Sequence, residues 1–147
     1  MRKLHLFILL TVDGYFEGKD QDLSWHNTDD EFTKFAYQQL DQTDILIFGR
    51  KTYQLMAEYW PTQLAADEEP ETTVRMNKMH KVVFSHKSFE PNWENTEVST
   101  DLIEKIKQLK SQDGKGIAIL GSSHLGKQII EAGLMDELRV MVNPVFI

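Results

Sequence analysis

The chain has 147 residues, with 16 Lys and Arg against 23 Asp and Glu, a formal net charge of −7, 41% hydrophobic residues and no cysteine. These values predict one globular domain, because domains run roughly 100 to 200 residues and a charged fraction of 27% is ordinary for a folded protein. The lack of cysteine excludes disulfides, zinc-thiolate sites and a cysteine nucleophile, and the acidic balance argues against duplex nucleic acid as a partner.

The amino-terminal segment predicts a buried strand rather than a signal peptide. Leu4–Val12 is an almost continuous apolar run that His5 interrupts, and Asp13-Gly14 predicts a turn where a signal peptide would have a small-residue cleavage site. No part of the sequence reaches the roughly 20 consecutive apolar residues that span a bilayer. We therefore expect a cytoplasmic protein with no membrane partner.

Apolar runs and amphipathic segments alternate along the rest of the chain. Further strands are predicted at 45–48, 81–85, 116–120 and 138–147, the last of them interrupted by Pro144. Helices are predicted from Thr28, over 51–59, from after Thr100 to Gly114, and up to Gly133. Residues 60–73 predict a solvated loop with at most a helical turn, because they hold two prolines and an acidic cluster. This order predicts an α/β protein with a mainly parallel central sheet and helices on both faces.

Two of the predicted helices carry more specific signals. Thr28, with Glu31 three residues later, matches a capping box at the start of the first helix. Leu125, Ile129 and Ile130 are spaced to form the apolar face of the helix that stops at Gly133.

The turns that follow the strands are the candidate site, because parallel sheets bind ligands at the carboxyl ends of their strands. Two of these turns are basic in an otherwise acidic chain. Residues 45–57 contain no acid and include Arg50 and Lys51. Residues 75–88 contain no acid either and include four Lys or Arg, with His80 and His86 beside them.

Both basic turns predict anion binding. Gly49 lets the backbone approach a ligand, Arg50 offers a planar fork to phosphate oxygens, and Thr52 adds a hydroxyl at a helix start. The alternative is that these residues are ordinary solvated charges that balance the acids.

Gly121-Ser122-Ser123, after the strand at 116–120, is a second candidate anion site, because free backbone amides at a helix start favour phosphate. The segment 121–127 also has the spacing of a nucleotide-binding P-loop, but residue 128 is Gln instead of the magnesium-holding Ser or Thr. A nucleotide triphosphatase is therefore disfavoured. A helix-start turn without a ligand is the alternative.

Asp29, Asp30 and Glu31 place carboxylates in the first turn of a predicted helix, where acids interact favourably with the helix dipole. That role is the alternative for each of them. Asp30 differs because Phe32 and Phe35 lie beside it, and a carboxylate over an apolar pocket can anchor the edge of a heterocycle. The five histidines have no metal-ligand spacing, so no metal site is expected.

Taken together, the motifs resemble the dihydrofolate reductase-like superfamily, most closely the RibD C-terminal branch, the reductase domain of bacterial riboflavin biosynthesis. The motifs are Leu10–Gly14 with Gly18, Leu23–His26 followed by Thr28–Asp30, Phe48–Tyr53, Val83–Ser85, Ile119–Ser122, and Gly133–Leu138 leading to Pro144-Val145. The segment Phe48–Tyr53 is the most specific of them, and the resemblance runs from residue 4 to residue 145.

The resemblance implies the three-layer fold of that superfamily in a single domain, 1–147, that lacks the final C-terminal hairpin of its relatives. It implies an NADPH-dependent reductase of a small heterocycle, either a pterin or a ribosylaminopyrimidine phosphate. The cofactor phosphates are then expected at Gly49, Arg50, Lys51 and Thr52, its adenosine 2′-phosphate side at Ser85, His86 and Lys87, and its pyrophosphate and nicotinamide ribose at Gly121, Ser122 and Ser123. Asp13, Trp25 and Asp30 are expected to face the substrate, with Asp30 as the candidate catalytic residue.

The chain departs from the folate enzymes at two places. Ser122 replaces their second glycine, and the three adjacent acids leave the register of Asp30 open by one position. Both departures favour a diverged reductase. A noncatalytic nucleotide-binding or assembly module that keeps the fold is the alternative, and the resemblance also implies a homodimer.

Overall fold

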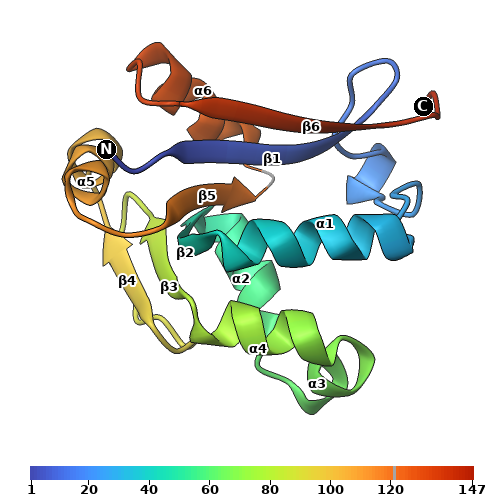
Figure 1. Ribbon diagram of the computed structural model, residues 1–147, viewed down its shortest axis with the longest axis horizontal. Helices are drawn as coiled ribbons and strands as arrows, with labels where there is room; N and C mark the ends of the chain where they lie inside the picture. The colour runs from blue at the N-terminus through green and yellow to red at the C-terminus, as the bar shows by residue number, and fades with distance from the viewer. Residues whose placement is uncertain (121) are drawn as a thin grey trace.

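The computed structural model describes residues 1–120 and 122–147 of the chain (Figure 1). The strands are β1 (Leu4–Thr11), β2 (Thr43–Gly49), β3 (His80–Phe84), β4 (Thr96–Ser99), β5 (Gly116–Leu120) and β6 (Glu137–Asn143). The helices are α1 (Asp30–Asp41), α2 (Arg50–Tyr59), α3 (Gln63–Glu68), α4 (Pro70–Lys78), α5 (Leu102–Ser111) and α6 (Ser123–Glu131), with a short 3-10 helix, η1 (Lys19–Gln21).

Within the described residues the strands form one sheet in the order β4-β3-β2-β5-β1-β6, and every neighbouring pair is parallel. Strand β5 lies at the centre, where Ile117 pairs with both Leu4 and Ile45. Because the strands are parallel, their carboxyl ends lie at one edge of the sheet. The predicted parallel sheet is confirmed, and the turns of interest lie at this edge.

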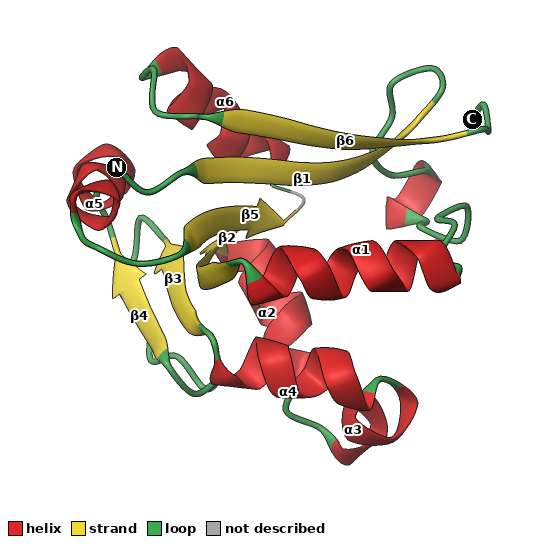
Figure 2. Ribbon diagram, in the orientation of Figure 1, coloured by secondary structure: helices red, strands yellow, loops and turns green. Residues whose placement is uncertain are grey.

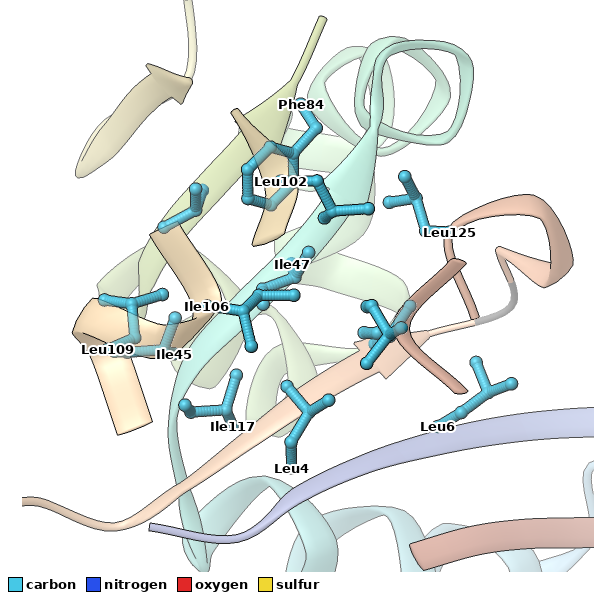
Figure 3. Packing of buried hydrophobic residues seen from close by; sticks show 13 residues of the cluster. Leu4, Leu6, Ile45, Ile47, Phe84, Leu102, Ile106, Leu109, Ile117 and Leu125 are labelled. Carbon is cyan, nitrogen blue, oxygen red and sulfur yellow. The ribbon is translucent and has the colours of Figure 1, made fainter. Parts of the chain in front are cut away.

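Alternate side chains of the central strands enter two separate cores, since successive residues of a strand point to opposite faces. Ile45 and Ile47 pack with Ile106 of α5 and the other apolar residues of that face, as Figure 3 shows. Leu46 and Phe48 pack on the other face. Full burial of one such side chain contributes roughly 1.5 to 3 kcal/mol, so both cores stabilise the sheet substantially.

The helices divide between the two faces in the same way (Figure 2). Leu102 and Leu125 bring α5 and α6 to one core, while Leu40, Tyr53 and Met76 bring α1, α2 and α4 to the other. The result is the predicted three-layer α/β fold with helices on both faces. Across the described chain no helix has the length and apolarity needed to cross a membrane.

Residues 60–73, predicted as a solvated loop, instead form α3 and the start of α4. Thr62 caps α3 by accepting a hydrogen bond from the amide of Ala65 at 3.2 Å. Pro70 stands at the first position of α4, where a helix tolerates a residue without an N–H. The Thr73 hydroxyl then donates to the carbonyl of Ala65 at 2.9 Å, which joins the two helices.

The start of α1 differs from the predicted capping box by one residue. Asp29, not Thr28, is the N-cap, and its carboxylate accepts a hydrogen bond from the amide of Phe32 at 2.9 Å. This register places Phe32 against Phe7 of β1, with 6.4 Å between the ring centroids. Packing on the sheet therefore selects the cap, and Glu31 has no capping role in the described contacts.

Other element boundaries also shift. Strand β4 was not predicted, because its residues Thr96–Ser99 are all only half buried and lack an apolar run. Helix α5 ends at Ser111 rather than Gly114, and Ile130 of α6 is 47% exposed instead of buried. Strand β6 ends at Asn143, because Pro144 has no N–H to continue a ladder.

Candidate functional site

A cavity of about 1860 Å³ opens at the carboxyl ends of β2, β3 and β5. Gly49, Phe84 and Leu120, the last residues of these strands, all line it. Pockets for drug-sized ligands usually measure roughly 300 to 1,000 Å³, so this cavity has room for a dinucleotide and a second small molecule.

The turns after β2 and β5 meet at this cavity. A Cβ atom built on Gly49 would lie 3.6 Å from the Ser122 hydroxyl, which shows how closely the starts of α2 and α6 approach. Neither N-cap, Gly49 or Ser122, donates or accepts a side-chain capping bond, and neither helix has an acid in its first turn. By contrast, Asp29 and Asp101 cap α1 and α5.

The starts of α2 and α6 therefore present backbone amides to the cavity without a built-in anion, which is the arrangement that binds phosphate. The cavity is lined by residues predicted for the cofactor site, namely Lys51, Thr52, Ser122 and Ser123. Gly121, predicted for the same site, lies outside the described residues.

Among the described residues, the predicted basic side chains of the cavity have no carboxylate partner. Arg50, Lys51 and Lys87 line the cavity, and none of them forms an ion pair within the described residues. The Arg50 guanidinium lies over the ring of Phe89, with Cζ 5.4 Å from the ring centroid. This contact holds Arg50 toward the loop after β3 that carries His86 and Lys87.

Not every residue of the basic window 75–88 belongs to the cavity. Arg75 pairs with Asp41 at 2.8 Å and with Glu71 at 3.1 Å. Lys81 is fully buried, and its ammonium donates to the carbonyls of Asn77, Met79 and Glu94. These two cations serve the fold, and neither Lys78 nor His80 lines the cavity. The basic residues of the window that do line it are His86 and Lys87, in the turn after β3.

Ser85 shapes that turn rather than offering a free hydroxyl. Its Oγ donates to the carbonyl of Lys87 at 2.6 Å and accepts from the amide of Lys87 at 3.3 Å. All three residues of the turn line the cavity, where Ser85 is buried and His86 and Lys87 are exposed. The hydrogen bonds of Ser85 therefore hold the two basic side chains at the surface of the cavity.

The motif residue Tyr53 has a structural role that sequence reasoning missed. Its side chain is buried, its hydroxyl accepts from the amide of Trp93 at 3.1 Å, and its ring packs on Phe48 and Trp93 at 6.3 and 6.0 Å between centroids. Tyr53 thereby fixes the first turn of α2, which carries Arg50 and Lys51.

An apolar region adjoins the basic turns. Helix α1 contributes residues at helical spacing, namely Phe32, Thr33, Ala36, Tyr37 and Leu40. Strand β1 contributes Phe7, Ile8 and Leu9, and α2 contributes Leu55 and Met56. Phe32 thus lines the cavity as the sequence suggested. Phe35 does not line it, although its ring also packs on Phe7, with 5.4 Å between ring centroids.

The predicted substrate residues Asp13, Trp25 and Asp30 do not line this cavity. Asp13 lies in the exposed turn after β1, where the hydroxyl of Thr11 lowers its pKa. The Trp25 indole donates to the carbonyl of Asp22 at 3.1 Å. Asp30 is exposed and is the first residue of α1, at the amino-terminal end of the helix.

His26, next to Trp25, does line the cavity. Its Nε2 is buried and has no hydrogen-bond partner among the described residues, and burial lowers the pKa of the ring, which favours the neutral form. The loop that carries it is fixed where the amide of Asn27 donates to the side-chain oxygen of Asn143 at 3.0 Å. The sequence motif Leu23–His26 includes this histidine, but no functional role was predicted for it.

The end of the cavity beside α3 is acidic. Glu68 and Glu69 line it, and both accept hydrogen bonds from the hydroxyl of Tyr59, at 2.9 and 3.0 Å. Burial and these two carboxylates raise the pKa of Tyr59. The sequence places these acids in a solvated loop, and only the helices α3 and α4 bring them to the cavity. In the part of the chain that the structure describes, no three His, Asp or Glu side chains gather to hold a metal ion.

Known proteins share both the sequence pattern and this fold. The family model described as the RibD C-terminal domain matches residues 2–147. "Uncharacterized protein YyaP" of Bacillus subtilis (strain 168) is 32% identical over 146 residues, which cover 98% of this chain and 76% of that protein. A crystal structure of a "Putative riboflavin biosynthesis protein" from Shewanella sp. PV-4 has a TM-score of 0.67 at 20% identity, covering 98% of this chain and 78% of that one.

The solved structure supports the dihydrofolate reductase-like fold, in which the basic and glycine-containing turns follow parallel strands. The family model extends over almost all of the chain, including those turns. The chain therefore belongs to the RibD C-terminal domain family, which is related to the reductase of riboflavin biosynthesis.

Proposed function

We propose that the protein is an NADPH-dependent reductase that transfers a hydride from nicotinamide to a small heterocycle of the pterin or ribosylaminopyrimidine type. One observation carries this proposal. Two helix starts without side-chain caps and three cations without ion-pair partners in the described residues border the same cavity, next to an apolar region. This combination suits a ligand with several phosphates and a flat ring system.

The residues of the cavity fit the phosphates of NADPH. The amides at the starts of α2 and α6, with Lys51, Thr52, Ser122 and Ser123, would hold the pyrophosphate. Arg50, His86 and Lys87 would bind the adenosine 2′-phosphate, because the contact with Phe89 directs Arg50 toward the loop of the other two.

Bound NADPH would supply the hydride, and the protein would supply orientation and a dry environment. Phe7, Phe32 and Met56 give the adjoining region apolar walls that exclude water from a substrate ring. Asp30 remains the proposed proton-relay and anchoring residue. Asp30 does not line the cavity, but it lies seven positions, close to two helical turns, before Tyr37, which does. This spacing supports a position for Asp30 on the same side of α1 as Tyr37.

The test is a titration of the protein with NADPH and with NADH, following nicotinamide fluorescence, and then a turnover assay with dihydropterin and ribosylaminopyrimidine substrates, both of which can accept a hydride. We expect NADPH to bind more tightly than NADH, because only NADPH carries the 2′-phosphate. Binding of neither nucleotide contradicts the proposed function. Binding of NADPH without oxidation of it by any substrate favours the noncatalytic module.

A further inference from the structure

In the part of the molecule that the structure describes, lysine and arginine line only one part of the cavity, whereas acids line several parts of it. Within the described chain its lysine and arginine residues are Arg50 and Lys51, at the start of α2 directly after β2, and Lys87, in the turn after β3. The acids that line it within the described chain are Glu17, Asp20, Glu68, Glu69 and Asp101. One of these acids, Asp101, caps α5 near the turn after β3, because Phe84 of β3 pairs with Ser99 of β4. Beyond the two basic turns, the described lining therefore has carboxylates and no lysine or arginine.

Helix α2 spans the distance between the basic turns and the acidic end. Arg50 is its first residue and Tyr59 its last. The Tyr59 hydroxyl holds the carboxylates of Glu68 and Glu69 at 2.9 and 3.0 Å, so the acids stay beside the far end of the helix. At 1.5 Å per residue the two ends of α2 lie roughly 14 Å apart. The negative end of the helix dipole adds to the negative potential around Glu68 and Glu69.

Apolar and aromatic side chains line the space between these ends. Tyr37, Met56, Trp60 and Met76 come from three different helices and the turn after α2. The Trp60 indole donates to the sulfur of Met56 at 3.1 Å, so its N–H is already used within the protein. These walls favour a flat ring, and neither Trp60 nor Met56 offers a donor to an anionic group.

We infer that the substrate is a flat heterocycle without a phosphate or carboxylate tail, either uncharged or cationic. The inference rests on the proposed function, in which the phosphates of NADPH use Arg50, Lys51 and Lys87. A phosphate on the substrate would then find no free lysine or arginine in the described lining, and a tail that extended past Trp60 would meet Glu68 and Glu69. If the anionic tail and one carboxylate were about 6 Å apart, their repulsion at an effective dielectric constant of about 20 would weaken binding roughly a hundredfold. Because these acids are exposed, solvent screening reduces the expected loss of affinity to about tenfold.

The test compares matched ligands in the presence of saturating NADP⁺, so that no turnover occurs. One pair is a dihydropterin ring with and without its glutamate-bearing tail, and the other is a ribosylaminopyrimidine with and without its 5′-phosphate. Calorimetry gives each dissociation constant. We expect the uncharged member of at least one pair to bind about tenfold more tightly than its anionic partner, because the carboxylates of the cavity repel only the anionic member.

The double variant E68Q/E69Q removes both charges and keeps side chains that accept from Tyr59. It should reduce the difference between anionic and uncharged ligands by at least about fivefold. Glu58→Gln is the matched control, because Glu58 is an exposed acid on α2 that does not line the cavity. Glu58→Gln should leave the difference in affinity between anionic and uncharged ligands unchanged. Thermal denaturation of each variant checks that it is folded at the temperature of the binding measurement.

Each remaining outcome decides the inference. Tighter binding of the anionic members, failure of both uncharged members to bind, or the same ratio in E68Q/E69Q as in the wild type would overturn it. These outcomes differ from failure of the proposed function, in which NADPH itself does not bind.

Discussion

At the amino-terminal edge of the sheet, Arg2 and Lys110 are buried and paired, whereas Arg50, Lys51 and Lys87 at the carboxyl edge are exposed and have no ion pair among the described residues. Arg2 binds Asp44 and donates to the carbonyl of Lys115 at 2.8 Å. Lys110 binds Asp136 at 2.5 Å and donates to the carbonyl of Leu134 at 2.8 Å.

The difference shows how one fold places cations for two purposes. A buried cation needs its partners within the protein, because an unpaired charge in the interior is costly. An exposed cation beside a cavity keeps its hydrogen-bond donors free for a ligand. Substitutions at the amino-terminal edge should therefore change stability, and substitutions at the carboxyl edge should change nucleotide affinity.

The largest effect is expected for Lys110→Ala. The substitution leaves the carboxylate of Asp136 and the carbonyl of Leu134 without their shared donor, which should cost about 3 kcal/mol of unfolding free energy. Urea denaturation measures this loss. The affinity of the folded variant for NADPH should equal that of the wild type, and a weakened affinity with normal stability would contradict the division between the edges.

His5, in the amino-terminal half of β1, makes stability depend on pH. It is 4% exposed, and burial together with Arg139 lowers its pKa to about 4. Its unfolded-state pKa is about 6.5, so between those values the unfolded chain binds the extra proton and stability falls as pH falls. The wild type should lose about 2 to 3 kcal/mol between pH 6.5 and pH 4 through this residue.

Urea denaturation across that pH range, compared with His5→Leu, isolates the contribution, because the acids shared by both proteins cancel. The variant should show a shallower decline over this range. Parallel curves for the two proteins would mean that His5 is protonated in the folded state.

Arg50→Ala and Lys87→Ala test the carboxyl edge. Each removes a charge-assisted contact with the 2′-phosphate, which should weaken NADPH by about 1.5 to 3 kcal/mol and NADH much less. Fluorescence titration measures both nucleotides, with Lys34→Ala as the control because Lys34 is exposed and does not line the cavity. Equal losses for NADPH and NADH would show that these cations do not distinguish the two nucleotides.

The smallest effect separates two adjacent acids at the start of α1. Asp29→Ala removes the N-cap and should cost about 1 kcal/mol of stability without lowering the turnover rate. Asp30→Asn should leave stability within about 0.5 kcal/mol but lower the turnover rate, because its proposed role is toward the substrate. Thermal denaturation and steady-state kinetics on both variants check this, and the reverse pattern would move the functional acid to Asp29.

The sequence predicts best the parts of the fold whose signals are local. Strand β5 begins and ends where its apolar run does, and the cores of β1 and β2 follow continuous apolar segments. Strand β4 has no such run, since Thr96–Ser99 are held by pairing with β3 rather than by burial. Pro70 was taken as a loop signal, although its place in the first turn of α4 is one that helices favour.

The candidate site divides in the same way. Gly49, Arg50 and Lys87 were predictable because glycine and basic residues directly follow apolar strands. His26 and Glu68 were not, because only tertiary packing brings the loop before α1 and the end of α3 to the same cavity. The window 75–88 also divides through packing, because Lys81 is buried whereas Lys87 lines the cavity and has no ion pair among the described residues.

The structure of the protein with NADPH bound is the most direct test of the carboxyl edge as the nucleotide site. We expect the 2′-phosphate within hydrogen-bond distance of Arg50 and Lys87, and the pyrophosphate at the amides that begin α2 and α6. A nucleotide bound elsewhere, or with its phosphates away from these residues, would contradict the proposal.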